Sequence, residues 1–147
     1  MKDNGGITLI EVIVVISIIS IVLLIPTLKK DTLLDYKERK ELMEFKNDIN
    51  YARNKAIVES TKYFVDVRPY SNSYVIYKQE MTRKIVKRKT FENGIVIYRN
   101  NIEGDEIIFT YSGAPEKSGT IELKNRKEQK IKLTITPAVG KVNIYFD

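Results

Sequence analysis

The sequence predicts an α+β fold in which a long bent N-terminal helix packs on an antiparallel β-sheet or a small β-sandwich. Three observations support this. The apolar residues near the start form one dense block, the next segment repeats apolar residues at helical spacing, and the remainder alternates apolar and polar residues as strands do. These patterns divide the chain into a leader at 1–6, an apolar helix at 7–28, an amphipathic helix at 29–60 and a β-rich head at 61–147.

Composition removes several classes of function. The 147 residues contain neither cysteine nor histidine, and their formal net charge is +6. Without these residue types the chain has no disulfide, no Cys/His metal cluster and no Ser/His/Asp triad. Gly113 and Gly119 bracket Pro115 rather than a helix start, so a phosphate-binding loop is not indicated. We therefore expect a protein that is not an enzyme and uses no metal or cofactor, with a weak preference for anionic partners.

The apolar block is typical of a transmembrane helix. A helix from Ile7 to Leu28 would be about 33 Å long, which is enough to cross the hydrocarbon core of a bilayer. A cleaved signal peptide would need a small-x-small site after the apolar core, and the sequence PTLKKD offers none. A retained span is therefore predicted, with a plain signal anchor as the alternative, and Pro26 is expected to kink the helix where it leaves the bilayer.

One acid, Glu11, interrupts the start of the apolar block. A carboxylate deep in the membrane costs about 2.5–3.5 kcal/mol on insertion scales, so such a group usually has a partner. Cleavage between Gly6 and Ile7 would free an amine one helical turn away, which would neutralise the acid within one chain or between neighbours. The alternative is that Glu11 lies unpaired and hydrated at the level of the lipid headgroups.

The stretch GGITLIEVIVVISIISIVLLIP resembles the N-terminus of type IV pilins and of the related pseudopilins of type II secretion and competence systems. The matching features are a short polar leader ending at Gly6, an apolar Ile7, the acid Glu11 and an unbroken apolar helix. The resemblance implies that a membrane-embedded prepilin peptidase cuts after Gly6 and methylates the amine of Ile7. It also implies that Glu11 pairs with the N-terminus of a neighbouring subunit during filament assembly.

The same resemblance implies a location and a set of partners. The chain would be a single-pass membrane protein with a cytoplasmic N-terminus and an outer head, and later part of an extracellular or envelope filament. Its partners would be other pilin or pseudopilin subunits, the prepilin peptidase and the inner-membrane assembly platform. The basic cluster at 29–40 by itself favours the opposite orientation, because positive residues tend to stay in the cytoplasm. The orientation predicted here is the one that the resemblance implies, with a cytoplasmic N-terminus and an outer head.

The amphipathic helix carries one apolar stripe, which is predicted to pack on the head's own sheet. Its members recur at alternating steps of three and four residues: Leu42, Phe45, Ile49, Ala52 and Ala56. Charged residues fill the other side, and Glu38 and Glu41 among them are expected to be solvated.

The head is predicted to contain eight strands, because runs rich in Val, Ile, Tyr and Phe are separated by turn signals. The expected strands are 62–68, 73–79, 83–91, 94–99, 105–111, 119–124, 129–136 and 141–146. Short strands joined by tight turns indicate antiparallel pairing. The runs at 52–57, 107–123 and 136–142 resemble minor pseudopilins of the GspH/FimT kind, in which a helix precedes a β-sandwich.

One expected strand of the head is strongly basic, with Arg83, Lys84, Lys87 and Arg88 as candidate contacts to DNA. The odd step between Lys84 and Lys87 predicts that the charges fall on both faces of the strand, which is also typical of a protected edge strand. The basic strand supports an alternative function. The chain would then be a standalone membrane-anchored module whose head contacts DNA or another anionic polymer.

Overall fold

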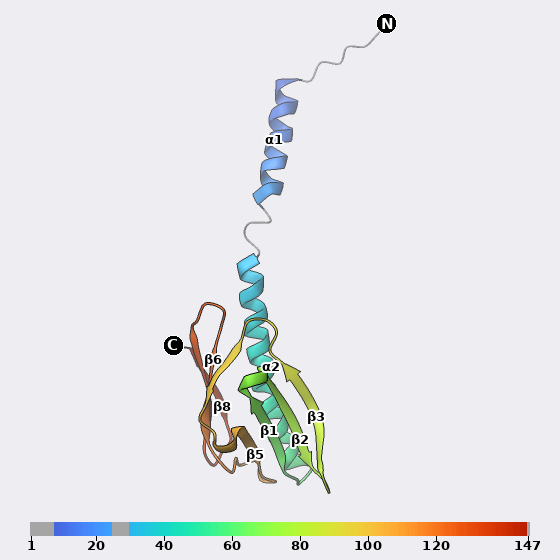
Figure 1. Ribbon diagram of the computed structural model, residues 1–147. Helices are drawn as coiled ribbons and strands as arrows, with labels where there is room; N and C mark the ends of the chain where they lie inside the picture. The colour runs from blue at the N-terminus through green and yellow to red at the C-terminus, as the bar shows by residue number, and fades with distance from the viewer. Residues whose placement is uncertain (1–7, 25–29, 147) are drawn as a thin grey trace. The chain divides into compact units, whose positions relative to one another are not determined.

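The computed structural model describes residues 8–24 and 30–146 (Figure 1). The chain divides into two compact units, Met1–Tyr36 and Lys37–Asp147. The predicted leader, the expected cleavage point between Gly6 and Ile7, and the expected kink at Pro26 all lie outside the described residues. The division of the chain at 1–6, 7–28, 29–60 and 61–147 therefore stays a prediction.

The first unit contains α1, Leu9–Leu24, which is apolar apart from Glu11, Ser17 and Ser20. Each serine hydroxyl donates to the backbone carbonyl four residues earlier at 2.7 Å, so the helix itself satisfies these polar groups. Helix α1 has 16 residues, and no helix in the described part of the chain is both long and apolar enough to cross a membrane.

The second unit contains most of α2, Lys30–Val58, and two four-stranded antiparallel sheets (Figure 1). The first sheet has the order β3-β2-β1-β5 and the second has the order β4-β6-β7-β8. The strands are β1 Tyr63–Arg68, β2 Ser73–Gln79, β3 Arg83–Thr90, β4 Val96–Asn100, β5 Glu106–Phe109, β6 Gly119–Lys124, β7 Lys130–Ile135 and β8 Val142–Phe146. Short 3-10 helices follow β1 (Pro69–Ser71) and precede β5 (Glu103–Asp105). The predicted α+β class and the eight strands are confirmed.

Helix α2 and both sheets share one hydrophobic core. All five residues of the predicted stripe are buried, with exposed fractions between 0 and 2%. They lie in one cluster with Ile76 of the first sheet and Leu133 of the second. The ring of Phe45 is 4.6 Å from the ring of Tyr74 and 5.3 Å from that of Phe91. The sequence expectation that this stripe packs on the head is confirmed.

Two acids of α2 differ from the sequence expectation. Glu38 and Glu41 were expected to be solvated, but they are only 4% and 5% exposed. Glu38 is covered because Arg126, in the turn between β6 and β7, bonds to its carboxylate. Glu41 is covered because its carboxylate accepts bonds from the backbone of the β3–β4 connection. Burying an ionised carboxylate costs free energy, and the hydrogen-bond donors around each of these acids offset that cost.

The expectation for Lys84 and Lys87 is also wrong. Lys87 lies opposite Ile76 and Lys84 lies opposite Lys78, so the two lysines share one face of the first sheet. The register between β2 and β3 shifts at this point, which is a β-bulge that inserts one extra residue into β3. Lys84 and Lys87 are three residues apart, which in a regular strand would place their side chains on opposite faces. The extra residue of the bulge returns them to the same face.

Candidate functional site

The N-terminal part of the candidate site lies at the first turn of α1. Thr8 immediately precedes the helix, and both its backbone N–H and its hydroxyl donate to Oε2 of Glu11 at 3.3 Å. In this Thr-x-x-Glu arrangement the acid satisfies a backbone donor that the helix leaves unpaired, which is one of the two bonds of a capping box. The carboxylate is also favoured there by the positive end of the helix dipole.

This arrangement places Glu11 near the predicted cleavage point. The backbone N–H that bonds to this carboxylate belongs to Thr8, the second residue after the predicted cleavage point. Gly6 and Ile7 themselves lie outside the described residues. The sequence reasoning missed the role of Thr8, although the spacing of Thr8 and Glu11 in the sequence is the signal for a capping box.

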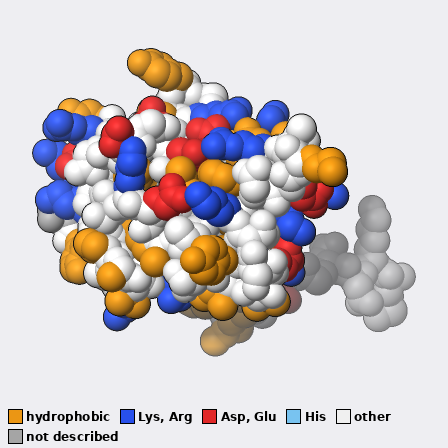
Figure 2. All heavy atoms as spheres, turned by 90° about the horizontal axis from the view of Figure 1, so that it is seen from below, with side chains coloured by type: hydrophobic (Ala, Val, Ile, Leu, Met, Phe, Trp, Pro, Cys, Tyr) orange, Lys and Arg blue, Asp and Glu red, His pale blue; other side chains and the backbone are white. Residues whose placement is uncertain are grey.

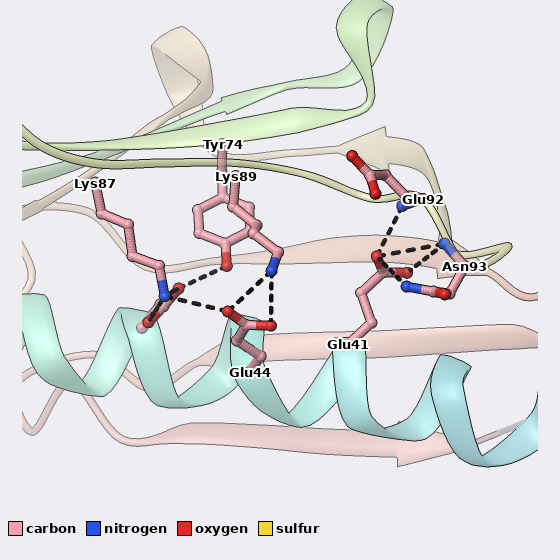
Figure 3. A network of polar contacts seen from close by, with 8 residues as sticks. Glu41, Glu44, Tyr74, Lys87, Lys89, Glu92 and Asn93 are labelled. Atoms are coloured by element: carbon pink, nitrogen blue, oxygen red, sulfur yellow. Dashed lines mark hydrogen bonds and ion pairs between the residues drawn. The ribbon is translucent and has the colours of Figure 1, made fainter.

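The second part of the candidate site is β3, whose inner face lies against α2 (Figure 3). The ammonium of Lys87 lies 2.7 Å from Oδ2 of Asp48 and 3.2 Å from Oε1 of Glu44. Lys89 also pairs with Glu44, at 3.1 Å. The hydroxyl of Tyr74 donates to Asp48 at 2.6 Å. The acids of α2 therefore neutralise the two lysines that face the helix.

The remaining cations of β3 differ in their surroundings. Arg83 lies 4.1 Å from the ring centre of Phe64 and pairs with Glu106 at 2.5 Å. Lys84 and Arg88 are exposed, and neither has an ion-pair partner within the described residues.

The four predicted contacts, Arg83, Lys84, Lys87 and Arg88, do not gather into one patch. Lys84 and Lys87 lie on the inner face of the sheet, whereas Arg83 and Arg88 lie on the outer face, opposite Gln79 and Val75. On the side of the molecule shown in Figure 2, basic and acidic side chains lie next to one another. A phosphate-binding surface needs cations clustered on one face. Contact with DNA therefore stays a prediction that this arrangement does not favour.

The charged groups along α2 have shifted pKa values that follow from their partners. The bond from Lys89, followed by that from Lys87, lowers the pKa of Glu44 against the opposing effect of burial. Near the end of the helix, bonds from Lys78, Lys55 and the Tyr63 hydroxyl lower the pKa of Glu59 to about 2. These acids are occupied by ion pairs, and in the part of the chain that the structure describes no cluster of three or more acids could hold a metal ion.

Comparisons with known proteins give matches for the N-terminal segment and for the fold. Residues 1–25 match the family described as the prokaryotic N-terminal methylation motif. A comparison with curated protein sequences finds no match. The fold is similar to the minor pseudopilin EpsH from the type 2 secretion system of Vibrio cholerae, with a TM-score of 0.57 and 11% sequence identity over 71% of this chain and 92% of that chain.

A second similar structure is the type IV minor pilin FimU of Pseudomonas aeruginosa. In one crystal form the TM-score is 0.55 and the identity 15%, over 76% of this chain and 92% of that chain. In another form the TM-score is 0.54 and the identity 12%, over 74% and 91% of the two chains.

The motif and the fold are both similar to those of type IV pilin-like proteins. The matched segment, residues 1–25, contains Gly6, Ile7 and Glu11, and proteins with this motif are anchored in the membrane by their N-terminal helix before assembly. Such proteins are structural rather than enzymatic. Residues 1–25 therefore carry the N-terminal methylation motif, and the fold of the chain is that of the minor pilins and pseudopilins.

Proposed function

We propose that the chain is a minor subunit of a type IV pilus-like filament that serves secretion, DNA uptake or adhesion. In this proposal prepilin peptidase cuts the chain after Gly6 and methylates Ile7, and the subunit then assembles through its N-terminal helix. The observation that carries the proposal is the methylation motif over residues 1–25, in which Glu11 occupies the first turn of an apolar helix.

The surface of α1 supports assembly through this helix. Its apolar side chains are exposed in the single chain, for example Leu9 at 81% and Ile21 at 63%. A helix that is apolar on all sides requires apolar surroundings. The bilayer would supply them first, with residues 7–28 spanning it, the N-terminus in the cytoplasm and the head outside. The helices of neighbouring subunits would supply them later, in an envelope or extracellular filament.

Glu11 would control the alignment of neighbouring subunits. Cleavage frees an amine at Ile7, and methylation leaves its positive charge in place. The amine of one subunit would then pair with Glu11 of the next in apolar surroundings, where opposite charges attract more strongly than in water. The two donors of Thr8 already hold the carboxylate at the N-terminal end of the helix, where an incoming amine would meet it.

Co-expression with a prepilin peptidase tests the processing step. We expect intact-mass spectrometry to show a chain that has lost the leader MKDNGG and gained one methyl group. The matched variant Gly6→Val places a branched side chain at the cleavage point, and we expect it to remain uncut. A wild-type chain that also remains uncut would contradict the proposed processing.

Filament incorporation tests the role of the charge. Glu11→Gln keeps the size of the side chain and an acceptor for Thr8 but removes the negative charge. We expect this variant to be cut normally and to be lost from sheared filaments. Ser17→Ala in the same helix removes only an intrahelical bond and should assemble normally. If Glu11→Gln enters filaments at full yield, alignment by this charge pair is excluded.

A further inference from the structure

The connection between β3 and β4 contains the pair Asn93–Gly94, for which the proposed function has no use. This connection passes from the first sheet to the second, as the β5–β6 connection also does. Asparagine is a chemically labile residue, and it is most labile before glycine, which has no side chain to shield its amide nitrogen. The fold requires glycine here, because Gly94 has φ +102° and a Cβ would lie 2.9 Å from Oε1 of Glu38.

The reaction open to this pair is deamidation. The amide nitrogen of Gly94 bonds to Cγ of Asn93, while the bond from Cγ to Nδ2 breaks and ammonia leaves with the proton of the Gly94 amide. Water then opens the cyclic imide at either carbonyl, which leaves aspartate or isoaspartate at position 93. No oxidant or reductant takes part.

Glu41 holds both nitrogens of Asn93 (Figure 3). Its Oε1 accepts a bond from Nδ2 of Asn93 at 3.2 Å, and its Oε2 accepts one from the backbone N–H of Asn93 at 3.2 Å. The backbone N–H of Glu92 donates to the same carboxylate at 2.7 Å. Glu41 is only 5% exposed, so water competes little for these bonds.

These contacts oppose the reaction in two ways. The side chain of Asn93 must turn until Cγ meets the Gly94 nitrogen, but the bond from its Nδ2 to Oε1 of Glu41 restricts that rotation. The backbone N–H of Asn93 holds the same carboxylate in place. The attacking nitrogen must also lose its proton and gain negative charge, which the nearby carboxylate of Glu41 disfavours.

We infer that Asn93 is a site of spontaneous deamidation and that Glu41 suppresses the reaction for as long as α2 is packed against the β3–β4 connection. The product would weaken the packing of α2 against the β3–β4 connection still further. A carboxylate at position 93 loses the Nδ2 donor and places a second negative charge beside a buried one, which destabilises the contact with α2. The inference does not depend on the proposed role in a filament.

The test uses the full chain in detergent micelles, incubated for days in mildly alkaline buffer and analysed by peptide mass spectrometry. The rate of conversion at Asn93 is compared in the wild type, Glu41→Gln and Glu41→Ala. We expect slow conversion in the wild type and a rate about tenfold higher in Glu41→Ala, because a charge-assisted hydrogen bond is lost. Glu41→Gln keeps one acceptor and should lie between the two.

Three controls separate the local contact from other effects. Asn4–Gly5 is the other Asn–Gly pair of the sequence and should convert at one rate in all variants. Glu92→Gln removes a neighbouring exposed charge and should leave the rate at Asn93 unchanged. Glu59→Gln weakens a distant ion-pair cluster and should also leave it unchanged, unless global unfolding limits the reaction. Equal rates at Asn93 in the wild type and Glu41→Ala would overturn the inference, as would no conversion in Glu41→Ala while Asn4 reacts.

Discussion

Lys84 and Lys87 lie on the same face of β3, but only Lys87 has acidic partners within the described residues. The bonding partners of Lys87 come from α2, with Asp48 39 positions earlier in the chain. Asp48 is 8% exposed and also accepts a bond from Tyr74, and burial together with this bond raises the pKa of the Tyr74 hydroxyl. Lys87 is therefore part of the structure, whereas Lys84 remains available to solvent.

The two lysines should respond differently to removal. Lys87→Ala leaves the buried carboxylate of Asp48 without its cation, and we expect it to lower the free energy of unfolding by about 1–3 kcal/mol. Lys84→Ala removes a solvated charge and should change it by less than about 0.5 kcal/mol. Urea denaturation followed by circular dichroism measures both. Equal effects would show that the pairing with α2 adds no stability.

Glu59 predicts a specific dependence of stability on pH. Its pKa falls from the ordinary value of 4.5 to about 2 in the folded chain, because it bonds to Lys78, Lys55 and Tyr63. A group whose folded pKa is lowered stabilises the fold above its unfolded pKa, and this contribution is lost as the pH falls to the folded value. We expect the urea midpoint of the wild type to exceed that of Glu59→Gln at neutral pH. The difference should shrink between pH 4.5 and about 2; a constant difference would contradict this.

At the scale of elements, the C-terminal part of α2 contacts two connections between strands of the head. Arg53 donates to the carbonyl of Gly113 at 3.2 Å, and a Cβ on Gly140 would lie 2.7 Å from the same carbonyl. The β5–β6 and β7–β8 connections therefore meet at one place on the helix. Short side chains are needed there, because a Cβ on Gly113 would lie 2.5 Å from Cδ1 of Ile57.

Two glycines with the same backbone angle allow a matched test. Gly113 and Gly104 both have φ +78°, but a Cβ on Gly104 would have no neighbour within 4 Å. Gly104→Ala should cost about 1–2 kcal/mol from the left-handed conformation alone. Gly113→Ala should cost more in urea denaturation, because the side chain of Ile57 must also move. Adding Ile57→Ala should recover the steric part; no difference between the two glycines would mean that this packing is unimportant.

At the scale of the whole molecule, residues 37–146 have one core rather than one core per sheet. Leu133 of the second sheet and Tyr74 of the first belong to the same buried cluster. A shared core predicts that both sheets unfold together, since neither sheet can lose its packing without exposing the other.

Leu133→Ala tests this cooperativity. The side chain is fully buried, and we expect its truncation to lower the free energy of unfolding by about 2–5 kcal/mol. The chain has nine tyrosines and no tryptophan, and the buried Tyr63 and Tyr74 lie in the first sheet. Tyrosine fluorescence and circular dichroism should therefore shift to one common midpoint. Thr134→Ala on the outer face of the same strand should have little effect, and two separate midpoints would exclude a single core.

The sequence by itself determined the α+β class, the eight strands and the N-terminal motif. These features depend on local patterns: the apolar block, the stripe of α2, the alternation of the strands, and the spacing of Gly6, Ile7 and Glu11. A local pattern fixes which face of an element is apolar, because helical and strand periods are properties of the backbone.

Only the tertiary structure decided where the charges of the head are placed. Glu38 and Glu41 are buried because donors from the β6–β7 turn and the β3–β4 connection reach them from distant parts of the chain. Lys84 and Lys87 share a face because a bulge in the pairing with β2 shifts the register. Neither the distant donors nor the bulge follows from local periodicity, since both depend on which segments meet when the sheets and α2 form one core.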